Sequence, residues 1–191
     1  MPTSKLSLLV FFLGCSLVSF AQIRLPRLIS DGMVLQREHN LKLWGWAAPQ
    51  EKIRIRVKDK NYYCQADQQG NWQVVLPPQP AGGPYEIQLK ASNELLIHDV
   101  YFGDVWICAG QSNMVLPMER VKERYPMEIE QANYPAIRYF FIPTIANLQT
   151  PQTDLPSGKW QVITPQNVLA CSATAYFLPK KSTNSTKFLL A

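Results

Sequence analysis

The chain of 191 residues has few histidines and cysteines, the side chains that most often bind metals in proteins. It contains only two histidines, His39 and His98, and its four cysteines show no Cys-x-x-Cys spacing. This scarcity excludes a zinc site of the usual spacing and a dense disulfide scaffold. It predicts free thiols, while one disulfide of unassigned pairing among Cys64, Cys108 and Cys171 stays open. A hydrophobic share of 47% excludes an intrinsically disordered chain.

Basic side chains are not concentrated on the body of the chain, although the net charge is +5. Lys5 lies near the start, and Lys180, Lys181 and Lys187 lie in the last twelve residues, so the rest carries 15 basic against 14 acidic side chains. No basic stripe remains that could follow a phosphate backbone, and we expect no nucleic-acid partner.

The first 21 residues have the pattern of a signal peptide. Lys5 precedes an apolar stretch over 6–18, and a Ser-Phe-Ala site predicts cleavage before Gln22 and export to the periplasm or the extracellular space. The stretch is short for a membrane span, and no later segment approaches the roughly 20 apolar residues that a span needs. Cys15 leaves open a lipoprotein, with lipid attached to that cysteine.

Residues 22–98 alternate apolar and polar side chains with period two and are interrupted by turn residues. This pattern predicts an antiparallel β-sandwich-like module. Its three tryptophans, Trp44, Trp46 and Trp72, would lie in the core or form a platform on which sugars stack. The expected strands lie at 41–46, 53–57, 62–66, 72–76, 85–89 and 95–97.

Residues 99–177 have the pattern of an α/β domain that begins without finishing. The nearly continuous apolar run 100–109 predicts a central parallel strand buried on both faces. Short helices are expected at 127–132 and from 169 to 178, and a second strand at 137–142. These are fewer strands than such a sheet needs, so we expect exposed apolar strand surface and aggregation.

Ser112 follows the buried strand at the position where α/β folds place reactive groups. Gly110 just before it permits close backbone approach. Because position 114 is Met114, the Gly-x-Ser-x-Gly pattern of α/β-hydrolases is not matched. From spacing alone, Ser112 is either a turn or helix-capping serine or a nucleophile.

Three stretches carry a family resemblance. Residues 103–114 read Gly-Asp-Val-Trp-Ile-Cys-Ala-Gly-Gln-Ser-Asn-Met, residues 28–37 are followed by Trp-Gly-Trp-Ala at 44–47, and residues 172–177 read Ser-Ala-Thr-Ala-Tyr-Phe. Together they resemble the sialate O-acetylesterase family, a branch of the SGNH (GDSL-like) hydrolases. The resemblance covers about residues 23 to 177.

The resemblance implies an SGNH-type α/β domain with a flavodoxin-like parallel sheet after the β-sandwich-like module. It implies removal of acetyl esters from sialic acid or related sugars, without a metal or organic cofactor. Ser112 would be the nucleophile and its backbone N–H an oxyanion donor, while Gly110, Gln111 and Asn113 would shape the loop or contact substrate. The partner would be an acetylated sugar, and the oligomeric state is left open.

The family's catalytic base is a histidine in a downstream Asp-x-x-His element, and no histidine follows Ser112. We therefore predict an inactive fragment whose reading frame shifts near residue 178, because one permitted codon choice for 178–191 encodes, in another frame, a helix end and an apolar strand. Residues 178–191 would then be an aberrant, poorly packed tail. Two alternatives remain: a non-catalytic secreted carbohydrate-binding β-sandwich protein, and an esterase for other acetylated polysaccharides.

Overall fold

The computed structural model describes residues 22–146, 149–180 and 187–190. The predicted signal peptide and Cys15 lie outside the described residues. Among the residues that are described, no helix has the length and apolar character needed to cross a membrane.

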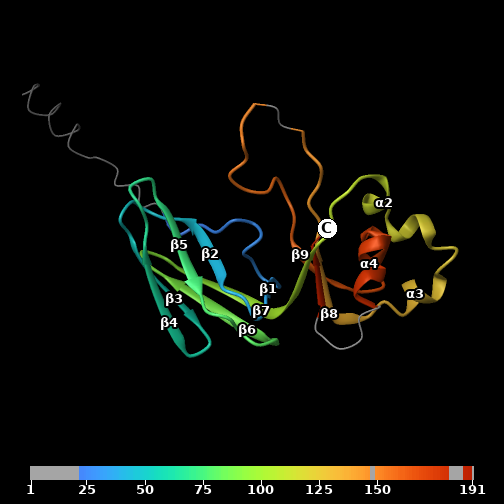
Figure 1. Cartoon of the computed structure of the whole chain (residues 1–191), viewed down its shortest axis with the longest axis horizontal. Helices are drawn as coiled ribbons and strands as arrows, with labels where there is room; N and C mark the ends of the chain where they lie inside the picture. Colours follow the sequence, from blue (N-terminus) through green and yellow to red (C-terminus); the bar gives the residue numbers. More distant parts are fainter. Residues whose placement is uncertain (1–21, 147–148, 181–186, 191) are drawn as a thin grey trace, which may run out of the picture.

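A curled mixed sheet dominates the fold, with strand order β4-β3-β6-β7-β10-β8-β9 and β1 beside β7. Figure 1 shows β7 running from the strand-rich part of the molecule to the part that carries the helices. Two further strands, β2 (Leu41–Trp46) and β5 (Asn71–Leu76), form a separate antiparallel ladder. The strands of the main sheet are β1 (Val34–Gln36), β3 (Lys52–Val57), β4 (Lys60–Gln65), β6 (Gly82–Lys90), β7 (Glu94–Ile107), β8 (Tyr134–Phe140), β9 (Trp160–Ile163) and β10 (Lys187–Leu190).

The alternation of β3 shows why these segments become strands. Ile53, Ile55 and Val57 are buried, while the residues between them are more exposed. Leu43 of β2 and Trp72 of β5 join the same hydrophobic core, so the ladder packs against the sheet. Each such side chain contributes about 1.5–3 kcal/mol when fully buried. The predicted antiparallel strands are confirmed.

The β-sandwich is not confirmed as a separate module, because one long strand crosses its predicted boundary. β7 pairs antiparallel with β6 and then, over 101–103, parallel with β1. The two parts were expected to meet between residues 98 and 99, where the apolar pattern of the sequence changes. Asp99 instead takes a backbone φ of 60° inside the strand, and the pairing continues beyond it.

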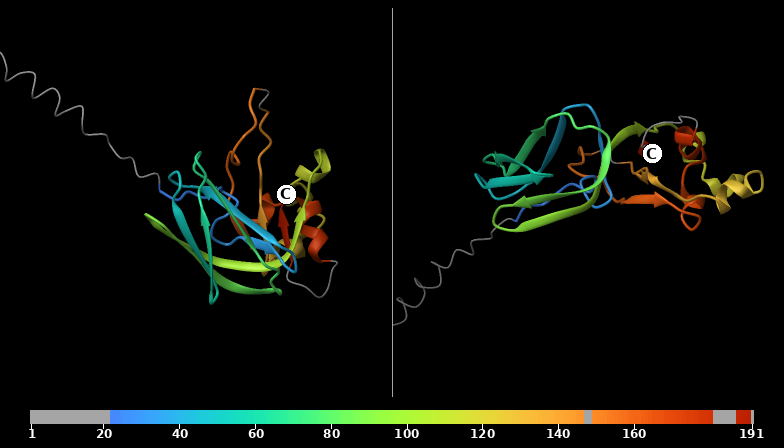
Figure 2. Two further views of the ribbon diagram at one scale, coloured as in Figure 1. Left: turned by 60° about the vertical axis from the view of Figure 1, so that its left-hand side comes forward. Right: turned by 90° about the horizontal axis from the view of Figure 1, so that it is seen from below.

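Short helices and a second, smaller core complete the α/β part. Met118, Tyr139 and Tyr176 are buried together, and the Tyr176 hydroxyl donates to the Glu128 carbonyl at 3.0 Å. Figure 2 shows these helices gathered beside β8. The helical segments are α2 (Ser112–Val115), the 3₁₀ turn η1 (Met118–Val121), α3 (Pro126–Glu130), the 3₁₀ turn η2 (Val168–Ala170) and α4 (Ala173–Lys180).

The central strand differs from the prediction in its exposure. Val100 and Phe102 are fully buried and the pairing with β1 is parallel, as expected. At the end of β7, however, Trp106 is 47% and Ile107 77% exposed. Because neighbouring residues of a strand point to opposite faces, burial on both faces was a wrong expectation for this end, where the described chain leaves both Trp106 and Ile107 exposed.

The structure describes only parts of the predicted tail, residues 178–191. α4 continues through Pro179 to Lys180, and β10 pairs in parallel with β7 and β8. The unpaired backbone groups of β7 and β8 offer hydrogen bonds to an added strand, and the apolar Phe-Leu-Leu stretch of β10 takes them. This pairing says nothing about the reading frame, so the frame shift stays a prediction.

Glu51 links two turns of the strand-rich part and supplies a pH-dependent test. Its carboxylate accepts hydrogen bonds from the backbone N–H groups of Ser92 at 2.7 Å and Ala48 at 2.9 Å. Burial acts to raise the pKa of Glu51, but hydrogen bonding to the Ser92 side chain, together with these two backbone hydrogen bonds, outweighs it and holds the pKa below its usual value. A lowered folded-state pKa stabilises the fold above the unfolded pKa, and this stabilisation is lost as the pH falls through the folded pKa.

We therefore expect Glu51→Gln to lower the midpoint of thermal unfolding at about pH 7 and to change it little at about pH 3. The exposed Glu123→Gln serves as the matched control and should change neither midpoint. Equal destabilisation by Glu51→Gln at both pH values would contradict this role of the carboxylate.

Candidate active site around Ser112

Ser112 is exposed at the start of α2, directly after the loop that leaves β7. The carbonyl of Gln111 accepts hydrogen bonds from the N–H groups of Met114 at 2.9 Å and Val115 at 3.2 Å. α2 is therefore a single turn. The N–H groups of Ser112 and Asn113 lie in this first turn, where helices have no internal acceptors for them.

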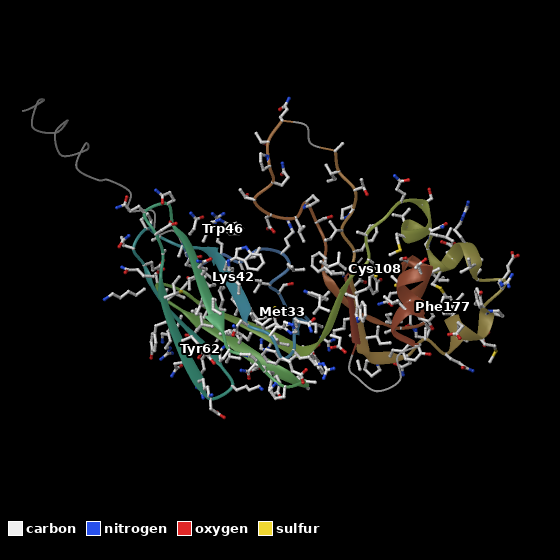
Figure 3. All side chains as sticks on the ribbon, viewed as in Figure 1. Met33, Lys42, Trp46, Tyr62, Cys108 and Phe177 are labelled. Carbon is white, nitrogen blue, oxygen red and sulfur yellow. The ribbon has the colours of Figure 1, made fainter. Side chains whose placement is uncertain are left out.

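The absence of a side chain at Gly110 lets this loop close on itself. A Cβ at that position would lie 2.7 Å from Cγ of Met114. Met114 packs against Cys108 and the fully buried Ala175 of α4. Figure 3 marks Cys108 at the end of β7, next to α4. The loop that presents Ser112 is thus anchored on α4 by a small apolar cluster.

Hydrogen bonds from the start of α4 hold the same loop. The Thr174 hydroxyl donates to the Asn113 carbonyl at 3.0 Å, and the Ala173 N–H donates to the Leu116 carbonyl at 2.8 Å. Sequence reasoning did not foresee these contacts. Thr174 and Asn113 nevertheless both lie in stretches that carry the family resemblance.

The remaining stretch of the three, residues 28–37, forms hydrogen bonds and an ion pair with β7. Arg37 Nε lies 2.7 Å from Asp104 Oδ1, and the Val105 N–H donates to Gln36 Oε1 at 2.9 Å. The Arg37 N–H donates to the Gly103 carbonyl at 2.9 Å. The opening stretch and the serine stretch, distant in sequence, therefore lie side by side along the strand that leads to Ser112.

Arg138 of β8 connects the two parts of the sheet and was missed by sequence reasoning. It is 3% exposed and donates to the carbonyls of Gly32 and Asp99, both at 2.9 Å. It also forms an ion pair of 2.8 Å with the Asp99 carboxylate and lies 4.4 Å from the ring centroid of Tyr101. The signal was a single cation between apolar neighbours in a predicted strand.

No base is brought to Ser112 within the described part of the chain, where the Ser112 hydroxyl has no hydrogen-bond partner. Both histidines are exposed and lie in the strand-rich part. His39 Nδ1 lies 3.0 Å from the Arg37 carbonyl oxygen, and His98 Nδ1 lies 2.9 Å from Glu86 Oε1. Neither contact involves Ser112 or the loop that carries it.

The three thiols of the described part are free, which confirms that prediction. Cys108 and Cys171 are buried, and burial raises the pKa of Cys171 to about 12. Such a thiol stays protonated and is a poor nucleophile. In the described residues, no group of three or more His, Cys, Asp or Glu side chains is arranged to hold a metal ion.

Comparison with known proteins finds similar esterases by sequence and by structure. No family model matches the chain. It is 28% identical to the sialate O-acetylesterase of Pongo abelii over 158 residues, 76% of its length, and 30% identical to that of Homo sapiens over 134 residues, 64% of its length. A crystal structure of a carbohydrate acetylesterase from Xanthomonas citri matches 88% of the chain with a TM-score of 0.83 and 35% identity.

The chain is a homologue of sialate O-acetylesterases and of this carbohydrate acetylesterase. It spans 30% and 26% of the two sialate O-acetylesterases and 39% of the Xanthomonas protein. The structural match extends over 88% of the chain, so the chain shares its fold with part of the Xanthomonas protein.

Proposed function

We propose that Ser112 is the nucleophile of a carbohydrate O-acetylesterase that removes acetyl esters from sialic acid or related sugars. The match to the Xanthomonas acetylesterase carries this proposal, because it covers 88% of the chain at 35% identity. The exposed position of Ser112 at the end of a strand supports it, since a substrate ester can reach the hydroxyl there.

The reaction follows the chemistry of a serine esterase. Ser112 Oγ attacks the acetyl carbonyl carbon while a base takes its proton, and the N–H of Ser112 donates to the oxyanion that forms. Collapse of this intermediate breaks the ester bond and releases the sugar hydroxyl, which receives the proton. Water then attacks the acetyl-serine, and acetate leaves. Gly110, Gln111 and Asn113 shape the loop or contact the sugar.

The base is the part that these 191 residues do not supply, because no histidine follows Ser112. A serine without its base loses most of the rate enhancement of the triad. We therefore propose that the chain by itself is an inactive fragment, and that the base comes from an Asp-x-x-His element in a longer protein.

The test uses a restored chain, defined as residues 22–177 followed by the corrected reading frame through that element. We expect the restored chain to release acetate from O-acetylated sialic acid faster than from acetylxylan, and the 191-residue chain to release almost none. Faster release from acetylxylan would favour the alternative, an esterase for other polysaccharides. A nucleotide sequence with no Asp-x-x-His continuation in any frame would contradict the fragment hypothesis.

A further inference from the structure

We propose that the outer face of the β2–β5 ladder is a second sugar-binding site, separate from Ser112. Along β2, the residues Lys42, Trp44 and Trp46 point away from the core. Trp44 pairs with Gln73 and Trp46 with Asn71 across the ladder. We call this surface, made of Trp44, Trp46, Asn71 and Gln73, the tryptophan face.

The tryptophan face lines a hollow of about 650 Å³, to which Asp67 also contributes. This volume lies in the range of about 300–1,000 Å³ that is common for small-molecule sites. Figure 3 marks Lys42 and Trp46 along β2, while Figure 1 shows β2 and β5 in the strand-rich part and α2 in the helical part. The hollow is therefore separate from the loop that carries Ser112.

The Trp-Gly-Trp sequence explains how two indoles come to lie on one exposed face. Residues two apart in a strand are about 6.6–6.8 Å apart and share a face. Gly45 between them is needed because a Cβ there would lie 2.3 Å from the Arg24 carbonyl oxygen and 2.9 Å from the Trp72 ring. Trp72 thus packs inward against Gly45, while Trp44 stays 37% exposed.

Trp46 is held in place by the segment that precedes β1. Arg24 and Trp46 exchange two backbone hydrogen bonds of 2.8 and 2.9 Å. The Arg24 guanidinium lies 5.7 Å from the centroid of the Trp46 ring. A ring that is already ordered loses little conformational entropy when a ligand stacks on it, so Trp46 is pre-organised for binding.

The polar groups around the indoles favour a sugar as the occupant. The Asp67 carboxylate accepts hydrogen bonds from the backbone N–H groups of Asn71 at 2.8 Å and Gln69 at 2.9 Å. The hydrogen bond from Asn71 is the main cause of the lowered pKa of Asp67. It therefore stays ionised beside the amides of Asn71 and Gln73. A pyranose combines an apolar C–H face, which an indole can cover, with hydroxyls that amides and a carboxylate can bind.

The test measures binding of two probes, 3′-sialyllactose and xylohexaose, to the 191-residue chain by isothermal titration calorimetry. We expect saturable binding of at least one probe, about tenfold weaker in Trp44→Ala, because stacking on the exposed indole is lost. Tyr63→Ala, which removes an exposed aromatic ring of β4 outside the hollow, is the matched control and should bind normally. Circular dichroism checks that each variant is folded.

The second-site inference does not rest on the proposed esterase function. Sugar binding by the Ser112→Ala variant tests the two separately. Binding that persists in Ser112→Ala and weakens in Trp44→Ala supports the second site whatever the esterase assay gives. Binding of neither probe, or binding that depends on Ser112 and not on Trp44, would overturn it. The chain could instead form a dimer that binds no sugar and that Trp44→Ala dissociates. This result would assign the tryptophan face to a second copy of the chain and would also overturn the sugar-binding proposal.

Discussion

Replacing Arg138 by methionine is expected to lower the free energy of unfolding of the chain by about 3 kcal/mol, the scale of losing one partner of a buried ion pair. The variant removes the ion pair with Asp99 and leaves the carbonyls of Gly32 and Asp99 without their side-chain donor. Methionine keeps much of the apolar contact, so the loss reports the polar contacts.

Urea unfolding followed by circular dichroism measures this change, and Arg120→Met is the control because Arg120 is exposed. The control should shift the free energy of unfolding by less than about 0.5 kcal/mol. Asp99→Asn should lower the free energy of unfolding by less than Arg138→Met does. The Asp99 side chain is 48% exposed, and the amide oxygen of asparagine still accepts a hydrogen bond. Equal stability of Arg138→Met and the parent would show that Arg138 does not hold the two parts of the sheet together.

The largest expected effect on rate is that of Ser112→Ala in the restored chain. We expect kcat for acetate release to fall by about ten-thousandfold or more, because the nucleophile of a serine hydrolase is lost. The melting temperature should hardly change, since Ser112 is exposed and its hydroxyl makes no hydrogen bond to the described residues. A large loss of rate at constant stability would thus report chemistry.

Ser157→Ala is the matched control for this variant, because Ser157 is also exposed but lies in the loop before β9. It should keep the rate of the parent. If Ser112→Ala retained turnover within about tenfold of the parent, a role for Ser112 as nucleophile would be wrong. A fall in melting temperature as large as that of Arg138→Met would instead point to a structural serine.

Local pattern was sufficient to predict most strands. The alternation of Ile53, Ile55 and Val57 identifies β3 and its buried face, since the period of a strand is two. The merging of two predicted segments into β7 was not visible, because a polar pair such as His98 and Asp99 is also typical of a turn. Its continuation depends on partners from β6 and β1, which local pattern does not contain.

In the candidate site, too, some features follow from short-range sequence and others depend on contacts between distant residues. The position of Ser112 after a strand, and the sharing of one face by Trp44 and Trp46, follow from short-range sequence. The contact from Arg138 to Gly32 joins residues 106 positions apart, and that from Thr174 to Asn113 joins residues 61 apart. Such contacts are set by sheet order and by packing of α4, and a single sequence carries no direct record of them.

The most direct test of the central claim is to trap the acetyl group on the protein. The restored chain is mixed with an O-acetylated sialic acid, quenched with acid within the first turnover, digested and examined by mass spectrometry. We expect the mass of one acetyl group on the peptide that contains Ser112, located on the serine by fragmentation and absent from Ser112→Ala. An acetyl group on another residue, or turnover with no acetylated peptide at any quench time, would contradict the account.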